Sequence, residues 1–329
     1  MRIALPSAGR VRLVCLLLAL WPIVPIAAQQ AGPGDSALSE PWQALGREVR
    51  DLAAQRHAVG FTVAVVVDGR LVWQRSHGTV AAGDPGGFDS RSRVPLGQMS
   101  ALYLVAAALR LEHAGLLDLD APVTTLLPAL RIGRVPSLHR APTVREILLG
   151  RSGLSMGRLE GRYCRVDDCR PLEDSDAELY ALSEPMVLGG LQSAAAMDVL
   201  VRVLEQVTGA AIETVIAREV TGPLGLDVPA FGDSVPLHRK GKRIPDLLTR
   251  ERYTLGAVST LDQLRRMSQA LLSADDSWLP RTSRLRLFSA QPLGDSAMPW
   301  ARAAYLFRVS DLPEAGPEVA RIASFFPYG

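Results

Sequence analysis

The sequence has few of the residues that bind metal ions in proteins. It contains three cysteines and five histidines among 329 residues. Cys15 lies in an apolar N-terminal segment, and the histidines are scattered without the spacing of metal ligands. A structural zinc site would need about four cysteine or histidine ligands gathered in one place. We therefore predict no metal site and no other cofactor.

The sequence also lacks an excess of charge of either sign. Its 36 lysines and arginines face 34 aspartates and glutamates. Residues 1–28 hold three of the arginines and no acid, so residues 29–329 carry a net charge of −1. This balance gives no electrostatic reason to expect nucleic acid as a partner. The local exception is the basic run 238–243, His-Arg-Lys-Gly-Lys-Arg, which we interpret as a solvated loop. The alternative is a contact for an anionic polymer or a membrane surface.

The apolar run near the N-terminus is short. It extends from Leu13 to Ile26 and is interrupted by Pro22 and Pro25, whereas a membrane-spanning helix needs roughly 20 apolar residues. Arginines precede the run and small residues follow it, as in a secretory signal peptide. We predict a signal peptide over residues 1–28, cleaved after Ala28, with no stable membrane span afterwards. The mature chain is then periplasmic or secreted.

Cys164 and Cys169 are the only cysteines that remain once residues 1–28 are removed. They flank a short, turn-rich stretch. An oxidising compartment favours a disulfide between such closely spaced cysteines over two free thiols. We predict a disulfide between Cys164 and Cys169.

Local patterns indicate a strand layer followed by a helical part. Residues 61–67 and 71–76 are rich in β-branched and aromatic side chains. Asp68-Gly69 between them suits the tight turn of an antiparallel hairpin. Residues 98–117 are apolar on nearly every side, which predicts a helix buried within the protein.

Helix starts can be placed from capping residues. Thr143 and Glu146 form a capping box ahead of an apolar stretch. Ser193 can cap another helix, and Ser259 or Thr260 can cap a third. These elements predict two layers, one containing a sheet and one mostly helical. The predicted fold class is α/β (α+β).

Five segments of the sequence together resemble a known family. In order along the chain they are FTVAVVVDGRLVWQRSHG, LEHAGLLDLDAPVTTLLP, TVREILLGRSGL, VLEQVTGAAIETVIAREVTGPLGL and GAVSTLDQLRRMSQALL. Each is similar to a segment of the β-lactamase-related serine hydrolases, which include serine β-lactamases, penicillin-binding DD-peptidases and some esterases. The resemblance implies a β-lactamase/transpeptidase-like domain over residues 29–329, an antiparallel sheet layer with a mostly helical sub-domain inserted at about 98–250. The family continues through further C-terminal strands, so either this sequence is cut short or its sheet is smaller.

The residues on which the family's chemistry depends are replaced. The resemblance places the serine nucleophile and lysine base of its S-x-x-K motif at Gln98 and Ala101. Its Y-x-N motif falls at Gln192 and Ala194, and its K-T-G or H-x-G strand is not recognisable near residues 319–329. Glutamine offers no ionisable nucleophile and alanine cannot accept a proton. Acylation by the family mechanism is therefore excluded at both positions.

Ser100 could serve as a displaced nucleophile with Tyr103, one helical turn later, as its base. On a helix Ser100 lies about 200° around the axis from Gln98 and faces away from the cleft. A tyrosine with a pKa near 10 is also a poor base. We therefore predict an inactive homologue whose cleft binds a peptide, a peptidoglycan fragment or a protein partner. The alternative is an active serine hydrolase of the β-lactamase, DD-peptidase or esterase type.

Overall fold

The computed structural model describes the chain in several stretches. These are residues 40–80, 87–130, 132, 140–154, 163–165, 194–231, 234–236, 238–239, 242–243, 247–249, 256–288, 291–292, 301–303, 308–310 and 319–321. The predicted signal peptide, Cys169, Gln192 and Ser193 lie outside them. Within these stretches, no helix has the length and apolar character needed to cross a membrane.

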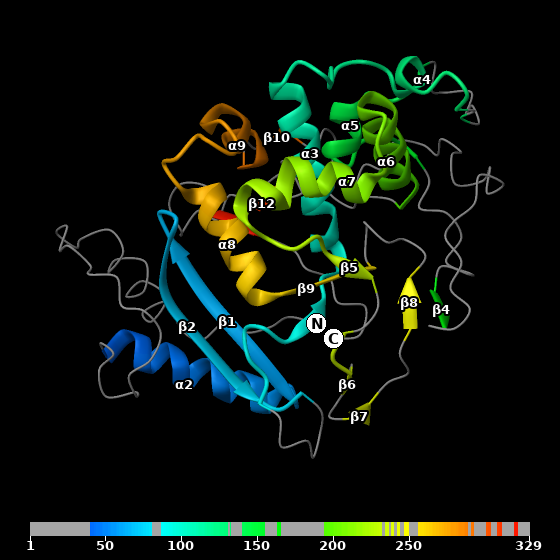
Figure 1. Cartoon of the computed structure of the whole chain (residues 1–329). Coiled ribbons are helices and arrows are strands. Elements are labelled where there is room, and N and C mark those ends of the chain that lie inside the picture. Colours follow the sequence, from blue (N-terminus) through cyan, green and yellow to red (C-terminus); the bar gives the residue numbers. More distant parts are fainter. Residues whose placement is uncertain are drawn as a thin grey trace.

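One end of the molecule is built from a helix and a hairpin, as Figure 1 shows. Helix α2 (Glu40–Gln55) leads into strands β1 (Gly60–Val67) and β2 (Arg70–Gly78), which pair antiparallel. Helix α8 (Leu261–Leu272) packs against both strands. Trp42 of α2 stacks on the buried Trp73 of β2, with ring centroids 6.1 Å apart. The predicted hairpin is confirmed, and helices α2 and α8, which are about 200 positions apart in the sequence, both pack against it.

The hairpin turn is fixed by its own backbone and by α8. Asp68 and Gly69 have φ values of 49° and 73°, and a two-residue turn of this hand requires positive φ at both central positions. A Cβ atom at Gly69 would lie 2.9 Å from the Cα of Ser273. The side chain of Gln269 donates a hydrogen bond to the Gly69 carbonyl over 3.1 Å. Glycine is therefore required both by the turn and by the close approach of α8.

The other described strands are short, and every pair among them is antiparallel. They form a three-stranded sheet in the order β3-β9-β5, two strand pairs, β4-β8 and β6-β7, and a four-stranded sheet in the order β10-β11-β12-β13. Their bounds are β3 (Arg93–Pro95), β4 (Tyr163–Arg165), β5 (Ala230–Phe231), β6 (His238–Arg239), β7 (Lys242–Arg243), β8 (Leu247–Thr249), β9 (Ala257–Thr260), β10 (Gln291–Pro292), β11 (Ala301–Ala303), β12 (Arg308–Ser310) and β13 (Val319–Arg321).

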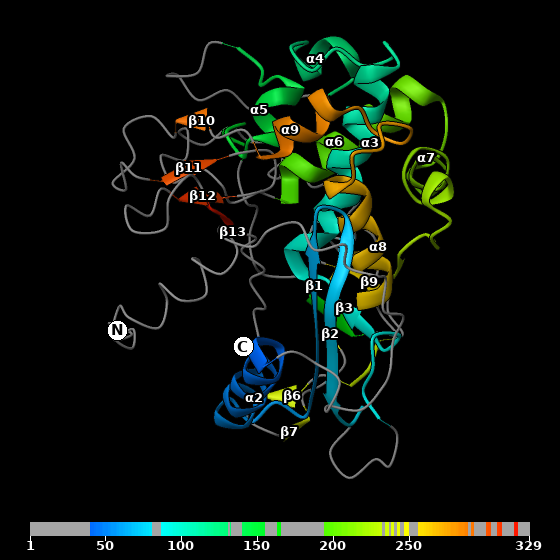
Figure 2. The same ribbon diagram turned by 90° about the vertical axis from the view of Figure 1, so that its left-hand side faces the viewer.

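Helix α3 (Ala101–His113) runs through the centre of the helical part, as Figure 2 also shows. Its residues from Ala101 to Leu109 are all buried, and none of them is charged. The predicted buried helix is confirmed, with two differences at its ends. The turn Gly97–Ser100 ahead of it is 3-10 helical, and the helix ends at His113 shortly before Gly115 adopts a positive φ.

In the described residues, the helical part also contains four further α-helices, a π-helical turn and a 3-10 turn (Gly222–Leu224). Helix α3 packs against α6, α7 and the π-helical turn Ala217–Thr221. These contacts explain why α3 has no polar face, since a surface helix would expose one side to water. The bounds are α4 (Val123–Leu126), α5 (Val144–Leu148), α6 (Ala194–Thr208) and α7 (Ile212–Ile216).

The C-terminal end of α8 is held by a residue from helix α9 (Arg281–Phe288). The guanidinium of Arg284 is almost completely buried and donates to the carbonyls of Ala270 and Ser273. It also forms an ion pair with Asp276 over 2.5 Å. Carbonyls at the end of a helix have no partner within the helix itself. Arg284 therefore supplies a cap from a neighbouring helix.

Helix α5 begins with the predicted capping box. Thr143 Oγ1 accepts from the Glu146 N–H over 3.2 Å, and the Glu146 carboxylate accepts from the Thr143 N–H over 2.9 Å. Burial acts to raise the pKa of Glu146, but hydrogen bonds from Arg140 and Thr143 outweigh it and leave that pKa below its ordinary value. The carboxylate is thus held in its charged form.

Replacing Thr143 by alanine should lower the free energy of unfolding by about 1 kcal/mol, because one N–H at the start of α5 loses its acceptor. Urea unfolding at neutral pH measures the change. Thr214, exposed within α7, provides a control, since Thr214→Ala removes the same atoms without removing a cap. A loss for Thr143→Ala no larger than that of the control would contradict the role of the box.

Candidate functional site

The head of α3 is the position at which the family's nucleophile would stand. The turn Gly97–Ser100 carries Gln98, and Gly97 has a φ of 55°. The turn lies against β9, and the Leu96 N–H donates to the carbonyl of Ala257 over 2.8 Å. Gln98 therefore occupies the entrance to α3, although its side chain lies outside the described part of the structure.

The position of the lysine base is occupied by Ala101, which is 1% exposed. It begins α3 and belongs to the main apolar core. A methyl group there can neither take nor donate a proton. The chain contains only two lysines, Lys240 and Lys242, and both lie in the basic run far along the sequence. No lysine elsewhere in α3 or its flanking turn can replace the missing one.

Ser100 is a structural residue at the junction of the turn and α3. Its side chain is completely buried. The hydroxyl donates to the Gly97 carbonyl over 2.6 Å and accepts from the Ala257 N–H over 3.1 Å. Both hydrogen bonds are to backbone atoms, one within the turn and one in β9. A hydroxyl held in this way satisfies a buried N–H.

The surroundings of Tyr103 do not favour its action as a base. Burial raises the pKa of Tyr103, and its hydrogen bond to Ser259 lowers it by less. The phenol oxygen lies 3.5 Å from Ser259 Oγ and points toward β9. A phenol with a raised pKa remains protonated at neutral pH and cannot remove a proton from Ser100.

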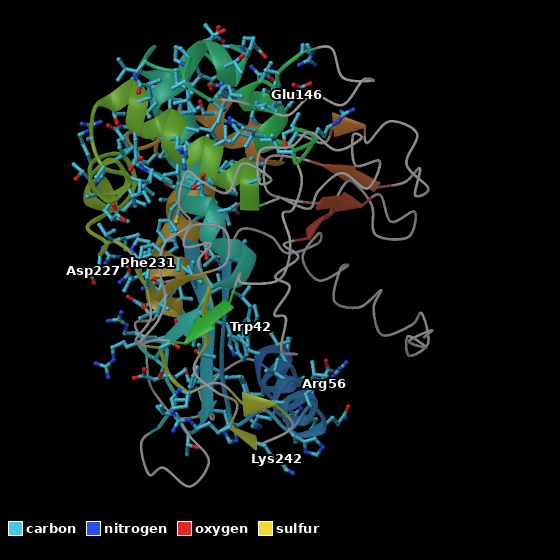
Figure 3. All side chains as sticks on the ribbon, turned by 90° about the vertical axis from the view of Figure 1, so that its right-hand side faces the viewer. Trp42, Arg56, Glu146, Asp227, Phe231 and Lys242 are labelled. Atoms are coloured by element: carbon cyan, nitrogen blue, oxygen red, sulfur yellow. The ribbon has the colours of Figure 1, made fainter. Side chains whose placement is uncertain are left out.

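A polar chain behind α3 was not expected from the sequence. It continues from Tyr103 through Ser259 Oγ, which lies 3.4 Å from Gln263 Oε1, to the exposed Asp227, which accepts from Gln263 Nε2 over 3.0 Å. Asp227 lies on the outside of the molecule in Figure 3. Ser259 thus turns toward Tyr103, and Thr260 is the residue that caps α8 by accepting from the Gln263 N–H. In the sequence, the only related sign of this chain was that either Ser259 or Thr260 could cap the helix that follows.

Only some of the remaining predicted site residues lie in the described part of the structure. Helix α6 begins at Ala194, whereas Gln192 lies outside the described residues. Cys164 lies in β4, but Cys169 is not described, so the disulfide stays a prediction. Residues 319–321 form β13, which pairs with β12. Among the described residues, no group of histidine, cysteine, aspartate and glutamate side chains could hold a metal ion.

Solved structures with the same fold include hydrolases and a penicillin-binding protein homologue. The octameric penicillin-binding protein homologue from Pyrococcus abyssi superposes with a TM-score of 0.63 at 17% identity, over 81% of this chain and 64% of that one. EstCE1, a hydrolase with promiscuous acyltransferase activity, gives 0.62 at 19% identity, over 84% and 86%. A D-stereospecific amidohydrolase from Streptomyces gives 0.61 at 21% identity, over 86% and 87%. These likenesses show the fold, and they confirm the predicted β-lactamase/transpeptidase-like class.

Sequence comparison identifies the family directly. Esterase EstB from Burkholderia gladioli is 32% identical over 195 residues, which are 55% of this chain and 49% of the esterase. The chain thus spans about half the length of this relative. The sequence profile of the Beta-lactamase family matches residues 45–322, which is most of the chain and includes all five segments that resemble the family. This protein belongs to the Beta-lactamase family of serine hydrolases and their relatives.

Proposed function

We propose that this protein is an exported, non-hydrolysing member of the Beta-lactamase family whose cleft binds a peptide, with peptidoglycan fragments as the first class to test. The observation that carries the proposal is the head of α3. There the nucleophile and base positions are Gln98 and Ala101, and the adjacent hydroxyl of Ser100 is buried between two backbone groups.

Binding without bond breaking follows from the chemistry of these side chains. An acyl transfer needs an activated nucleophile and a group that accepts its proton. The amide of a glutamine can donate to a carbonyl oxygen and accept from an amide N–H, but it cannot form an acyl intermediate. Ala101 contributes only apolar surface. A peptide bond at this position could therefore be held by hydrogen bonds and released unchanged.

The class of ligand is inferred from relatives. Proteins with this fold include a penicillin-binding protein homologue and a D-stereospecific amidohydrolase, so compounds with amide bonds are reasonable ligands for a cleft of this kind. Export is supported by the signal-peptide pattern of residues 1–28. Peptidoglycan lies outside the cytoplasmic membrane, so an exported protein could encounter it. Export and the binding of peptidoglycan fragments are therefore compatible parts of the proposal.

The competing hypothesis is an active hydrolase that uses Ser100 as its nucleophile. The relatives named as an esterase and as hydrolases are its support. Against it stand the complete burial of Ser100, the two backbone hydrogen bonds of its hydroxyl and the raised pKa of Tyr103. Reaction with mechanism-based reagents separates the two hypotheses.

The purified chain of residues 29–329 should form no covalent adduct with benzylpenicillin or a fluorophosphonate, as judged by the mass of the intact protein. Soluble peptidoglycan fragments should bind reversibly in calorimetry and be recovered intact. Gln98→Ala should weaken that binding by about two- to tenfold, the equivalent of one hydrogen bond. Gln55→Ala, on the exposed end of α2, is the matched control. An acyl adduct that disappears in Ser100→Ala would establish the competing hypothesis instead.

Ser100→Ala should lower the free energy of unfolding by about 1–3 kcal/mol, because the buried N–H of Ala257 loses its acceptor. Urea unfolding measures the loss. The control is Ser268→Ala in α8, where the lost hydroxyl only donates to the Leu264 carbonyl of its own helix, so stability should change little. An unchanged stability of Ser100→Ala would show that the bridge to β9 is dispensable.

Restoring the motif with Gln98→Ser and Ala101→Lys should give a protein that is less stable than the parent and at best slowly acylated. A lysine at the buried position of Ala101 must be desolvated or lose its proton. Members of a catalytic unit also contribute non-additively, so two repaired positions restore little. Turnover of a chromogenic cephalosporin measures activity, with Gln98→Ser alone as control. Turnover close to that of an ordinary family enzyme would show that the rest of the site is intact.

A further inference from the structure

Strand β1 has one edge without a partner strand. It pairs with β2 on one side, and within the described residues no other strand pairs with it. The ladder with β2 is regular from Gly60 to Val65, with a register shift after Val65. Proteins commonly block an open edge with charged side chains or a proline, because its unpaired N–H and C=O groups can pair with another chain. Strand β1 contains neither a charged residue nor a proline, so this edge is not blocked in that way.

The hydrogen bonds of the hairpin show which backbone groups face the open edge. The carbonyl of Val59 accepts from the Thr79 N–H over 3.0 Å, and these two residues are therefore a hydrogen-bonded pair. Such pairs alternate with non-hydrogen-bonded pairs along an antiparallel ladder, so Thr62 and Ala64 belong to the second kind. Side chains approach most closely in that kind of pair, in agreement with the 2.6 Å between Thr62 Oγ1 and Ser76 Oγ. The N–H and C=O groups of Thr62 and Ala64 thus point away from β2.

The backbone groups at this edge are only partly accessible to water. Thr62 and Ala64 are half-buried, and within the described part of the chain their N–H and C=O groups have no hydrogen-bond partner. A backbone group that is removed from water without a partner costs free energy. In the neighbouring strand, Trp73 Nε1 and Gln74 Oε1 are also buried without a partner. The hairpin therefore has the unpaired polar groups of a sheet that lacks a strand.

The two faces of β1 have different neighbours. Figure 2 shows the hairpin between α2 on one side and α8 on the other. Trp73 stacks on Trp42 of α2 and lies opposite Val65 in the register. Because side chains alternate along a strand, Val65 faces the α2 side, whereas Thr62 and Ala64 face the α8 side. A strand added at the open edge would therefore place every second side chain under α8 and the others beside Val65.

The position of α8 limits the width of what can lie beside β1. Helix α8 packs more extensively on β1 than on β2, so it overlies the half of the hairpin that carries the open edge. Two copies of the hairpin paired edge to edge would have both copies of α8 on the same face. Neighbouring strands are about 4.8 Å apart, whereas packed helices need about 8–10 Å between their axes. The edge thus suits a single strand and not a second copy of this chain.

We propose that the open edge of β1 binds a single extended, uncharged segment of another protein, with small and apolar side chains in alternation. The N–H and C=O groups of Thr62 and Ala64 hold its backbone. The small side chains lie under α8, and the apolar ones lie beside Val65. Strand addition of this kind takes its affinity from main-chain hydrogen bonds and its specificity from alternate side chains. The site is separate from Gln98 and Ala101 and does not depend on the proposed function.

The probe is the capped peptide acetyl-Val-Ser-Val-Ser-Val-Ser-amide, added to the whole chain of residues 29–329. It should bind saturably and slow the amide hydrogen exchange of Thr62 and Ala64, as read by NMR, because their N–H groups gain acceptors. The control peptide acetyl-Val-Val-Val-Ser-Ser-Ser-amide has the same composition without the alternation. It should bind roughly tenfold more weakly, since only part of it can match both faces of the edge.

Ala64→Pro removes an N–H that faces the open edge. Proline is tolerated where its nitrogen points outward from an edge strand, so the ladder with β2 should survive. Affinity for the alternating peptide should fall about three- to tenfold, the equivalent of one hydrogen bond. Ser76→Pro is the matched control, because the Ser76 N–H points outward from the other edge of the hairpin, and it should leave the affinity unchanged. Thr62→Lys places a charge at the open edge without changing the backbone, and it gives an independent test if Ala64→Pro unfolds.

Several results would overturn the proposal. One is equal affinity for the two peptides, and another is an equal effect of Ala64→Pro and Ser76→Pro. Slow exchange of Thr62 and Ala64 in the free monomer would mean that the chain covers this edge itself. Protection that rises with protein concentration, together with the mass of a dimer in light scattering, would mean that a second copy occupies the edge.

Discussion

The fold depends on the burial of α3 on all sides. A helix can pass through the centre of a domain only if it brings no unpaired charge with it, because desolvating a lone charge costs several kcal/mol. From Ala101 to Leu109 the helix is free of charge, and the first ionic residue, Arg110, is paired with Glu219. A catalytic lysine at position 101 would interrupt this apolar stretch. Alanine at this position keeps the buried start of the helix uncharged, whereas a lysine there would have to be desolvated or lose its proton.

The head of α3 is also tied to a distant part of the chain. Ser100 and Leu96 both bond to Ala257, so the turn that carries Gln98 is fixed to β9 across more than 150 positions of sequence. A ligand bound at this turn would contact a backbone that hydrogen bonds to β9 hold in place. Rigid surfaces lose little conformational entropy on binding. If this turn binds a ligand as proposed, the hydrogen bonds that hold the Ser100 hydroxyl would also reduce the entropy lost on binding.

The parts of the fold that could be predicted from the sequence have local signals. Asp68-Gly69 specifies a hairpin turn, Thr143 and Glu146 specify a helix start, and an unbroken apolar stretch specifies a buried helix. The chain from Tyr103 to Ser259, 156 positions apart, could not be found in this way because each residue alone has an ordinary alternative role. The assignment of the family's S-x-x-K positions to Gln98 and Ala101 came from resemblance to the family, because neither residue has a physical signal of its own that marks a site.

The cap that Arg284 provides for α8 makes the order of chain synthesis relevant to folding. The β1–β2 hairpin is among the first elements to emerge, yet it packs on α8, and Gly69 bonds to Gln269, 200 positions later. The carbonyls of Ala270 and Ser273 in turn gain their side-chain donor only after Arg284 has been synthesised. The N-terminal hairpin therefore completes its packing only when nearly the whole domain has been made. Contacts of such long sequence separation slow folding, and the side of β1 that packs on α8 stays uncovered until α8 has been synthesised.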